Sequence, residues 1–263
     1  MTNGTVDSQE IAHFAGRAHS WWDPQGSFRP LHRLNPTRIF FIRDRLAAHF
    51  GRDGAGLSPF SGLRLLDIGC GGGLIAEPMA RLGFAVVGID ADAAAIAVAR
   101  AHAEESGLAI DYRVAAAESL ADQGERFDAV LGLEIIEHVA DPAPFFAALG
   151  GFVRPGGAFV GATINRTPRA FALAVVGAEY ILRWLPRGTH DWRKFVRPSE
   201  FVLGLRRNGF AVTELSGVSY DILSGNWRLS PDLEVNYMLM AVRHCEAPQA
   251  PRQSRGIASL RSR

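Results

Sequence analysis

The feature that most constrains the fold is a glycine-rich run that follows a short apolar segment, Leu63–Ile68. The run covers residues 69–73, and a helical pattern begins directly after it at Leu74. Glycine has no Cβ, so this backbone can turn tightly and lie against a ligand. The unpaired N–H groups at the start of the next helix can then face the same ligand. A strand, a glycine loop and a helix in this order predict a βα unit with a binding site at the carboxyl end of a parallel strand.

Apolar segments of strand length alternate with helical segments along the rest of the chain. We expect strands at 63–68, 85–90, 110–114, 127–133, 158–163, 211–215 and 237–242, and helices at 74–82, 93–105, 145–153 and 199–208. Strands separated by helices of this length imply right-handed βαβ units and a mostly parallel sheet. We therefore predict an α/β fold with a Rossmann-like, doubly wound sheet of seven strands. The sheet would have an antiparallel edge strand, and the domain would add N-terminal helices and a helical insertion after the fifth strand.

The composition excludes several classes of protein. The net charge of +1 gives no overall field that favours nucleic acid, so no nucleic-acid partner is expected. The two cysteines, Cys70 and Cys245, are far apart, and neither a disulfide framework nor a structural zinc site is expected. The N-terminus has no signal-peptide pattern, and no apolar run approaches the roughly 20 residues that span a bilayer. We expect a cytoplasmic protein, and a peripheral contact with the inner face of the membrane stays open.

The chain divides into three predicted regions. Polar residues 1–10 are expected to form a flexible N-terminus, and residues 246–263, rich in arginine with few large apolar side chains, a flexible tail. Residues 11–245 would form one domain, which is long enough to bury a core of its own. Within this domain, residues 165–195 are predicted to be the helical insertion.

Two acidic residues lie beside the glycine loop. Asp67 precedes the first glycine, Gly69, and Asp90 ends the second predicted strand, where an acid can accept hydrogen bonds from both hydroxyls of a ribose. From Gly71 onward the loop also satisfies the G-x-G-x-x-A pattern of dinucleotide enzymes, so an NAD-dependent oxidoreductase is an alternative. The pattern Asp67-x-Gly69-x-Gly71-x-Gly73 instead resembles the first motif of class I methyltransferases, which bind S-adenosylmethionine.

Segments outside the loop narrow this resemblance to the ubiquinone biosynthesis O-methyltransferases. The segments that resemble that family are Trp21-Trp22-Asp23 and residues 31–38, 133–139, 175–183, 188–191 and 235–238. The resemblance runs from about Ile11 to Val242. It implies methyl transfer from S-adenosylmethionine to hydroxyls of polyprenylated phenols and catechols, at both O-methylation steps of ubiquinone synthesis. The expected partner is a polyprenylated quinone precursor, and contact with other enzymes of ubiquinone biosynthesis stays open. A non-catalytic lipid or quinone carrier with the same fold is the alternative.

The resemblance also assigns residues to the cofactor. It implies that Asp67, Gly69 and Gly71 lie at its amino-acid end and that Asp90 holds its ribose. Arg38 would pair with the methionine carboxylate. Further positions expected beside the cofactor are Glu118, near the adenine, and Leu133. Glu118 could equally be an exposed acid at a helix start.

Glu134, Glu137 and His138 follow the fourth predicted strand and are the candidate reactive groups. Methyl transfer to a phenol needs an in-line geometry and a base or a metal that favours the phenolate. If the segment is helical, its spacing puts all three side chains on one face, where they could bind a divalent ion such as Mg²⁺. In the metal-free alternative, His138 is the general base and Glu137 or Glu134 orients it. In a third alternative the acids cap a helix and His138 is structural.

The insertion contains an apolar stretch, Phe171–Leu185, flanked by basic residues and by Trp184 and Trp192. Aromatic residues beside cations on an apolar helix are typical of a segment that lies in a membrane interface. We therefore expect residues 165–195 to contact lipid transiently and to admit the polyprenyl tail. A helix packed on the core or in a dimer contact is the alternative.

Overall fold

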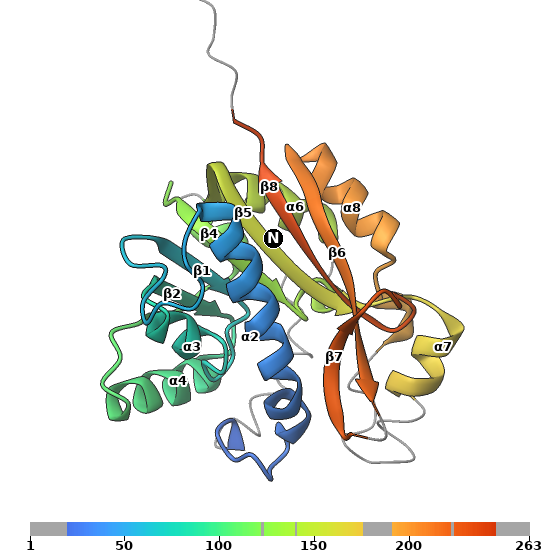
Figure 1. Ribbon diagram of the computed structural model, residues 1–263, viewed down its shortest axis with the longest axis horizontal. Coiled ribbons are helices and arrows are strands. Elements are labelled where there is room, and N and C mark those ends of the chain that lie inside the picture. Colours follow the sequence, from blue (N-terminus) through green and yellow to red (C-terminus); the bar gives the residue numbers. More distant parts are fainter. Residues whose placement is uncertain (1–19, 122–123, 140, 176–190, 222–223, 246–263) are drawn as a thin grey trace, which may run out of the picture.

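A computed structural model gives the structure and describes residues 20–121, 124–139, 141–175, 191–221 and 224–245. These residues form an eight-stranded sheet with the order β3-β2-β1-β4-β5-β8-β6-β7 (Figure 1). The strands are β1 (Arg64–Ile68), β2 (Ala85–Asp90), β3 (Asp111–Val114), β4 (Phe127–Leu133), β5 (Val153–Ile164), β6 (Phe210–Asp221), β7 (Asn226–Ser230) and β8 (Asn236–Arg243).

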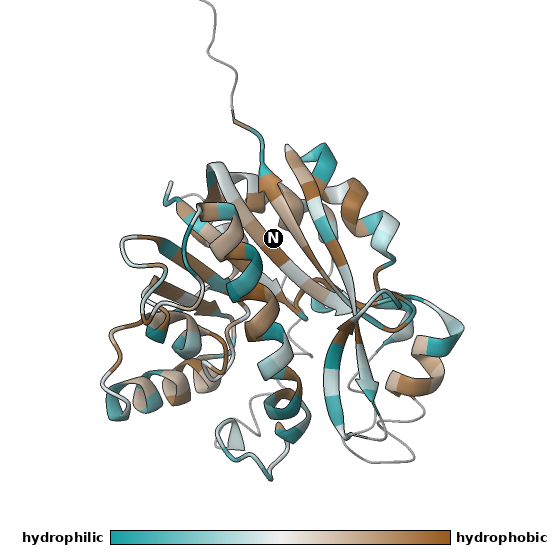
Figure 2. Ribbon diagram, viewed as in Figure 1, coloured by the Kyte–Doolittle hydropathy of each residue, from teal (hydrophilic) through white to brown (hydrophobic). Residues whose placement is uncertain are grey.

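The first five strands are parallel, as predicted, and the last three are antiparallel to their neighbours. The sheet has eight strands rather than the predicted seven because Asn226–Ser230 forms β7, in a hairpin with β6. This edge strand has no buried residue, and in Figure 2 it is mostly hydrophilic. It therefore lacks the apolar run by which the inner strands were predicted. The same hairpin explains why β6 is longer than predicted.

Helices cover both faces of the sheet. The helices are α2 (Arg29–Phe50), α3 (Ala76–Arg81), α4 (Ala93–Glu105), α5 (Ala117–Ala121), α6 (Pro142–Phe152), α7 (Pro168–Ala170) and α8 (Pro198–Arg207), with 3-10 turns η2 (Ile136–His138) and η4 (Trp192–Lys194). Side chains of α2, α3 and α4 contribute to one core cluster, and those of α5, α6 and α8 contribute to the other. Successive residues of β1 alternate between the clusters, with Leu65 in the first and Leu66 in the second, as the pleat of a strand buried on both faces requires.

The strand order places the binding edge of the sheet. The chain runs outward from β1 through β2 to β3, and then returns to β4 on the other side of β1. Such a reversal opens a crevice at the carboxyl ends of the strands, where open α/β sheets bind their ligands. The loops that follow β1, β2, β4 and β5 meet at this edge.

Several predicted regions fall outside the described residues. These are the N-terminal residues 1–19, residues 176–190 of the insertion and residues 246–263, so the predicted domain boundaries remain predictions. Residues 165–175 and 191–195 show the two ends of the insertion, which leaves the sheet after β5 and returns before α8. Among the described helices, none combines the length and the apolar character that crossing a bilayer would take.

The central strands should carry much of the stability. Leu131 in β4 is fully buried, so Leu131→Ala should lower the free energy of unfolding by about 2–5 kcal/mol, from lost burial and the cavity that remains. Urea denaturation measures this change. Leu57→Ala removes the same atoms from a side chain that is 96% exposed, and a change within about 0.5 kcal/mol is expected. Equal losses in the two variants would contradict the placement of the core.

Candidate functional site at the carboxyl edge of the sheet

The glycine loop is fixed to the end of β2. The N–H groups of Gly69 and Cys70 both donate to the carbonyl of Ile89, at 2.8 and 3.0 Å. Gly69, Gly71 and Gly73 have φ values of 74°, 52° and 90°, which lie in the left-handed region. Residues that have a Cβ disfavour this region, so the backbone conformation explains why glycine occupies these three positions.

Asp90 closes this loop with its side chain. Its Oδ2 accepts the N–H of Gly71 at 2.8 Å, and its Oδ1 accepts the N–H of Asp92 at 2.8 Å. Burial raises the pKa of Asp90, while these two N–H groups act in the opposite direction. The carboxylate is only half-buried and each oxygen has a further lone pair. Asp90 can therefore hold the loop and still accept a hydroxyl of a ligand.

Asp67 lies beneath the loop as a buried acid. It is 3% exposed, and its Oδ2 has no hydrogen-bond partner among the described residues. Burial raises the pKa of Asp67 to about 7, and the negative charge of Asp90 adds to the effect. A cation placed at the loop would favour the ionised form. This unpaired carboxylate oxygen therefore marks a position suited to a positively charged ligand.

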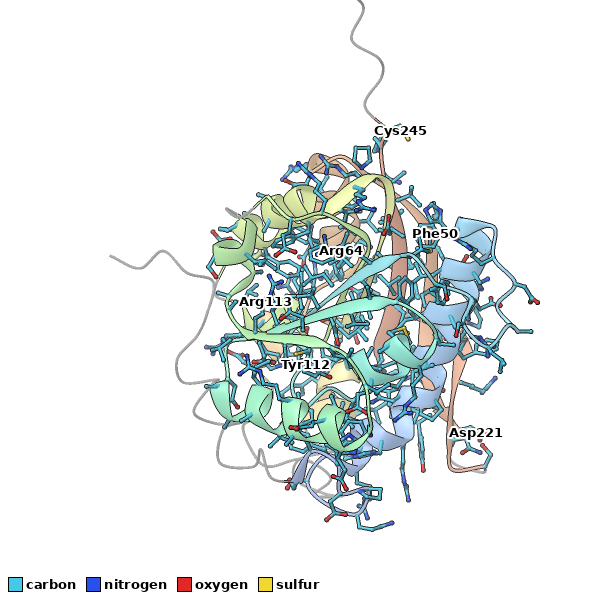
Figure 3. The ribbon with its side chains drawn as sticks, turned by 90° about the vertical axis from the view of Figure 1, so that its left-hand side faces the viewer. Phe50, Arg64, Tyr112, Arg113, Asp221 and Cys245 are labelled. Carbon is cyan, nitrogen blue, oxygen red and sulfur yellow. The ribbon has the colours of Figure 1, made fainter. Side chains whose placement is uncertain are left out.

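Cys70 and Tyr112 share this buried environment. Tyr112, labelled in Figure 3, lies on β3 near α4, and its hydroxyl approaches Gly73 so closely that a Cβ there would overlap with it. Burial raises the pKa of the Cys70 thiol well above its usual range, and the nearby carboxylates of Asp67 and Asp90 raise it further. A thiol in this state is a poor nucleophile, so Cys70 is not a candidate reactive group.

Arg38 and Glu134 form an ion pair across the site. Arg38 is a buried residue of α2, and its Nη2 donates to Glu134 Oε1 at 2.5 Å. Glu134 follows β4 with a φ of 51°, and its N–H donates to the carbonyl of Ala162 in β5 at 2.8 Å. The predicted partner of Arg38 was a ligand carboxylate, whereas its partner here is Glu134. The guanidinium has further N–H groups, so a ligand would share it with Glu134.

Glu137 is a second, more deeply buried acid. It is 4% exposed, and Thr163 at the end of β5 donates its hydroxyl to Oε2 at 2.8 Å. Burial raises the pKa of Glu137 well above its usual range, and the neighbouring carboxylate of Glu134 raises it further. Thr163 was missed at the sequence level because a lone threonine in an apolar strand carries no motif.

The helical spacing assumed for Glu134, Glu137 and His138 is not present. Only Ile136–His138 forms a 3-10 turn, and Glu134 lies outside it in the left-handed region. Glu134 bonds to Arg38, while Glu137 bonds to Thr163. Within the described part of the chain, no three His, Cys, Asp or Glu side chains are grouped to hold a metal ion. These donors therefore do not fit a divalent cation in this arrangement.

The remaining predicted positions lie around the same edge. Leu133 is the half-buried last residue of β4, and it pairs with Ala162 of β5. His138 is half-exposed at the end of its 3-10 turn. Glu118 lies in α5, but its side chain is outside the described structure. The fold thus brings Arg38, Asp67, Gly69, Gly71, Asp90, Leu133, Glu134, Glu137 and His138 to one edge of the sheet.

Comparisons with known proteins identify relatives of the chain. Residues 66–161 match a family model described as a methyltransferase domain. The ubiquinone biosynthesis O-methyltransferase of Paramagnetospirillum magneticum is 55% identical over 240 residues, which cover 91% of this chain and 96% of that protein. The protein of the same name from a Chelativorans species is 54% identical over 237 residues, 90% of this chain and 94% of that protein.

Solved structures show the same fold at much lower identity. A magnesium protoporphyrin IX methyltransferase from Synechocystis with bound SAH is 19% identical, with a TM-score of 0.59 over 88% of this chain and 94% of that one. An S-adenosylmethionine-dependent methyltransferase from Clostridium acetobutylicum is 11% identical, with a TM-score of 0.61 over 88% and 99% of the two chains. These similarities establish the class of fold.

Asp67 should make the unliganded protein sensitive to pH. A carboxyl whose pKa is raised on folding contributes stability that is complete below about pH 4, and this stability is lost as the pH rises to about 7. Asp67→Asn removes the titration, so the melting temperature should fall less between pH 5 and pH 8 than in the unaltered protein. Calorimetric scans without ligand measure the slope. The control is Asp53→Asn, at an exposed acid, which should keep the original slope. An Asp67→Asn slope equal to the control's would show that Asp67 is not the titrating group.

Proposed function

The chain belongs to the ubiquinone biosynthesis O-methyltransferase family, and from this premise we propose that it methylates phenolic hydroxyls of polyprenylated ubiquinone precursors. The methyl donor is S-adenosylmethionine, and we propose that the chain carries out both O-methylation steps of ubiquinone biosynthesis. The observation that carries it is identity above 50% to relatives of that name over about nine-tenths of the chain. The family membership also favours the methyltransferase interpretation of the glycine loop over the NAD-dependent alternative.

The residues at the carboxyl edge fit this cofactor. S-adenosylmethionine supplies a methyl group bound to a positively charged sulfur, together with an amino-acid end and an adenosine. The glycine loop would receive the amino-acid end, where the unpaired Oδ2 of Asp67 suits a cation. Asp90 would accept the ribose hydroxyls, because its oxygens retain lone pairs beside the two N–H groups that they already accept. Leu133 and Glu118 would lie along the adenosine.

The chemistry assigned to the chain is proton removal and positioning. The phenolic oxygen attacks the methyl carbon, the carbon–sulfur bond breaks with its electron pair going to sulfur, and the phenolic proton passes to a base. We assign His138 as this base, since an imidazole accepts a proton near neutral pH. Glu137, buried on the same turn and held by Thr163, would help to orient this base by fixing the turn that carries it. Arg38 keeps Glu134 in place beside Glu137.

A divalent ion is not part of this mechanism. Its three proposed ligands are not grouped within the described residues, and Glu134 is directed to Arg38 while Glu137 is directed to Thr163. An ion that displaced Arg38 from Glu134 would take away the ionised partner of a buried guanidinium, which is costly. The geometry therefore favours the metal-free base of the two catalytic alternatives.

The ends of the insertion support a contact with lipid. Phe171, Leu173 and Trp192 are exposed large apolar residues, and the rings of Phe171 and Trp192 meet edge to face. They follow β5, on the side of the sheet that carries the site. Nearby, Arg166 pairs with Glu200, and Arg169 pairs with Asp232 and Glu234. Because acids compensate these two arginines, we propose that apolar insertion contributes more to membrane binding than charge does. Trp184, which was predicted to lie on this surface, is outside the described residues.

The base assignment predicts a loss of turnover without a loss of cofactor binding. His138→Ala should lower kcat by about 10²–10⁴-fold, the usual contribution of a general base, with the affinity for S-adenosylhomocysteine nearly unchanged. Methyl transfer to a short-chain O-demethylated ubiquinol measures the rate. The unaltered enzyme should keep its activity in a chelator. If a chelator abolished the activity and a divalent ion restored it, a metal ion rather than His138 would be the group that favours the phenolate. A failure of the unaltered enzyme to methylate any phenol or catechol would refute the proposed function.

The membrane proposal predicts a specific loss of vesicle binding. The double variant Phe171→Ser with Leu173→Ser should bind phosphatidylglycerol-containing vesicles less tightly, because two exposed apolar side chains are lost. Sedimentation with vesicles, at low and at high salt, measures the bound fraction. Leu57→Ser is the matched control, since this exposed leucine lies between α2 and β1, at the opposite edge of the sheet. Equal binding by the double variant and the control would refute a contact through this surface.

A further inference from the structure

The segment before α2, residues 20–28, lies against the glycine loop, and we call it the strap. The indole of Trp21 packs directly on the backbone of Gly71 and Gly72. A Cβ at either glycine would overlap with the indole carbons. These two glycines therefore permit a close contact with an aromatic ring as well as a tight turn. The sequence gives no sign of this contact, because Trp21 and the loop are 50 residues apart.

Trp22 fixes the strap to the same loop. Its Nε1 donates to the carbonyl of Gly72 at 2.9 Å. Its ring stacks on His102 of α4, with centroids 3.5 Å apart and planes at 3°. The Nδ1 of His102 in turn lies 2.6 Å from Oε1 of Glu77, a buried residue of α3. The strap is thus bound to the loop and to α4, and His102 connects it to α3.

The other end of the strap is continuous with α2. The ring of Trp21 stacks on Phe28, with centroids 3.8 Å apart. The carbonyl of Trp21 lies 2.8 Å from Nε2 of His32 in the first turn of α2. These contacts fix the orientation of Trp21 from both sides, so its position on the loop is not that of a loosely placed surface side chain.

One atom of Trp21 lacks a partner. Its Nε1 is buried and has no hydrogen-bond acceptor among the described residues. A buried N–H without an acceptor is costly, and such a donor usually bonds to a ligand or water. The proposed function places the amino-acid end of the cofactor at this loop, and its carboxylate is an acceptor of the required kind. Trp21 therefore offers this loop an unpaired donor together with a flat apolar face.

Resting on the proposed function, we propose that Trp21 is a cofactor-binding residue. Its indole forms a wall over the amino-acid end of S-adenosylmethionine, with Nε1 as a hydrogen-bond donor, and the strap retains the bound cofactor. Because the strap leads into the helix that carries Arg38, the cofactor wall and the ion pair of the site are held by one element. This role differs from occlusion, in which Trp21 would have to leave the loop before the cofactor binds.

The test is direct binding of S-adenosylhomocysteine to the full chain, without any acceptor substrate. Trp21→Ala should raise Kd on the order of tenfold, which is about 1.4 kcal/mol. Most of the change should appear as faster dissociation in stopped-flow measurements. Trp21→Phe keeps the stacking ring but removes the N–H, so an intermediate increase in Kd is expected. The control is Trp227→Phe on β7, which should bind as the unaltered chain does.

The outcomes separate this inference from the proposed function. If the unaltered chain binds S-adenosylhomocysteine and both Trp21 variants keep its Kd and dissociation rate, the role of Trp21 is refuted and the methyltransferase function stands. Tighter binding by Trp21→Ala would show occlusion and would also refute it. No binding by the unaltered chain would overturn the function and the inference together. Circular dichroism melting identifies a variant that has lost its fold. If Trp21→Ala is such a variant, the Kd of Trp21→Phe for S-adenosylhomocysteine decides whether Trp21 binds the cofactor.

Discussion

The site depends on one carboxylate that holds three pieces of backbone together. Asp90 ends β2, accepts the N–H of Gly71 in the loop after β1, and accepts the N–H of Asp92 at the start of α4. Asp92 in turn caps α4 by accepting the N–H of Ala94 at 2.8 Å. The loop, the strand end and the helix therefore take up their positions as a unit. Because the glycines alone would leave the loop conformationally free, this acid gives the binding edge its fixed shape.

The long helix α2 joins the two halves of the site. At its start it holds the strap on the glycine loop, and in its middle Arg38 reaches Glu134 after β4. Directly before Arg38 in the chain, the hydroxyl of Thr37 donates to the carbonyl of Trp227 in β7 at 2.9 Å. Figure 1 shows α2 crossing the face of the sheet toward the lower part of β7. A helix held at three such points positions groups from distant parts of the chain against one another.

The sequence-based expectations were accurate where local signals decide the structure, and they failed where contacts between distant parts of the chain decide it. β2, α4 and β4 have the bounds that their apolar patterns predicted, because periodicity and capping residues are local signals. The predicted placement of Glu134, Glu137 and His138 on one helical face was wrong, because the left-handed backbone of Glu134 interrupts the helical spacing. Thr163 and the contact of Trp21 with the loop were not predicted. Both depend on strands and helices far apart in the chain meeting at one edge, which no local pattern encodes.

The buried Asp67 has a consequence for the exchange of protons with solvent. Near neutral pH its carboxyl is only partly ionised in the empty site, because burial raises its pKa to about 7. A cation bound at the glycine loop would draw the carboxyl into its ionised form and expel the remaining fraction of a proton into the buffer. The measured heat of ligand binding would then include the heat of protonating the buffer, so it would differ between phosphate and Tris. Occupation of the site by a cation would thus release acid, because of the unpaired oxygen beneath the loop.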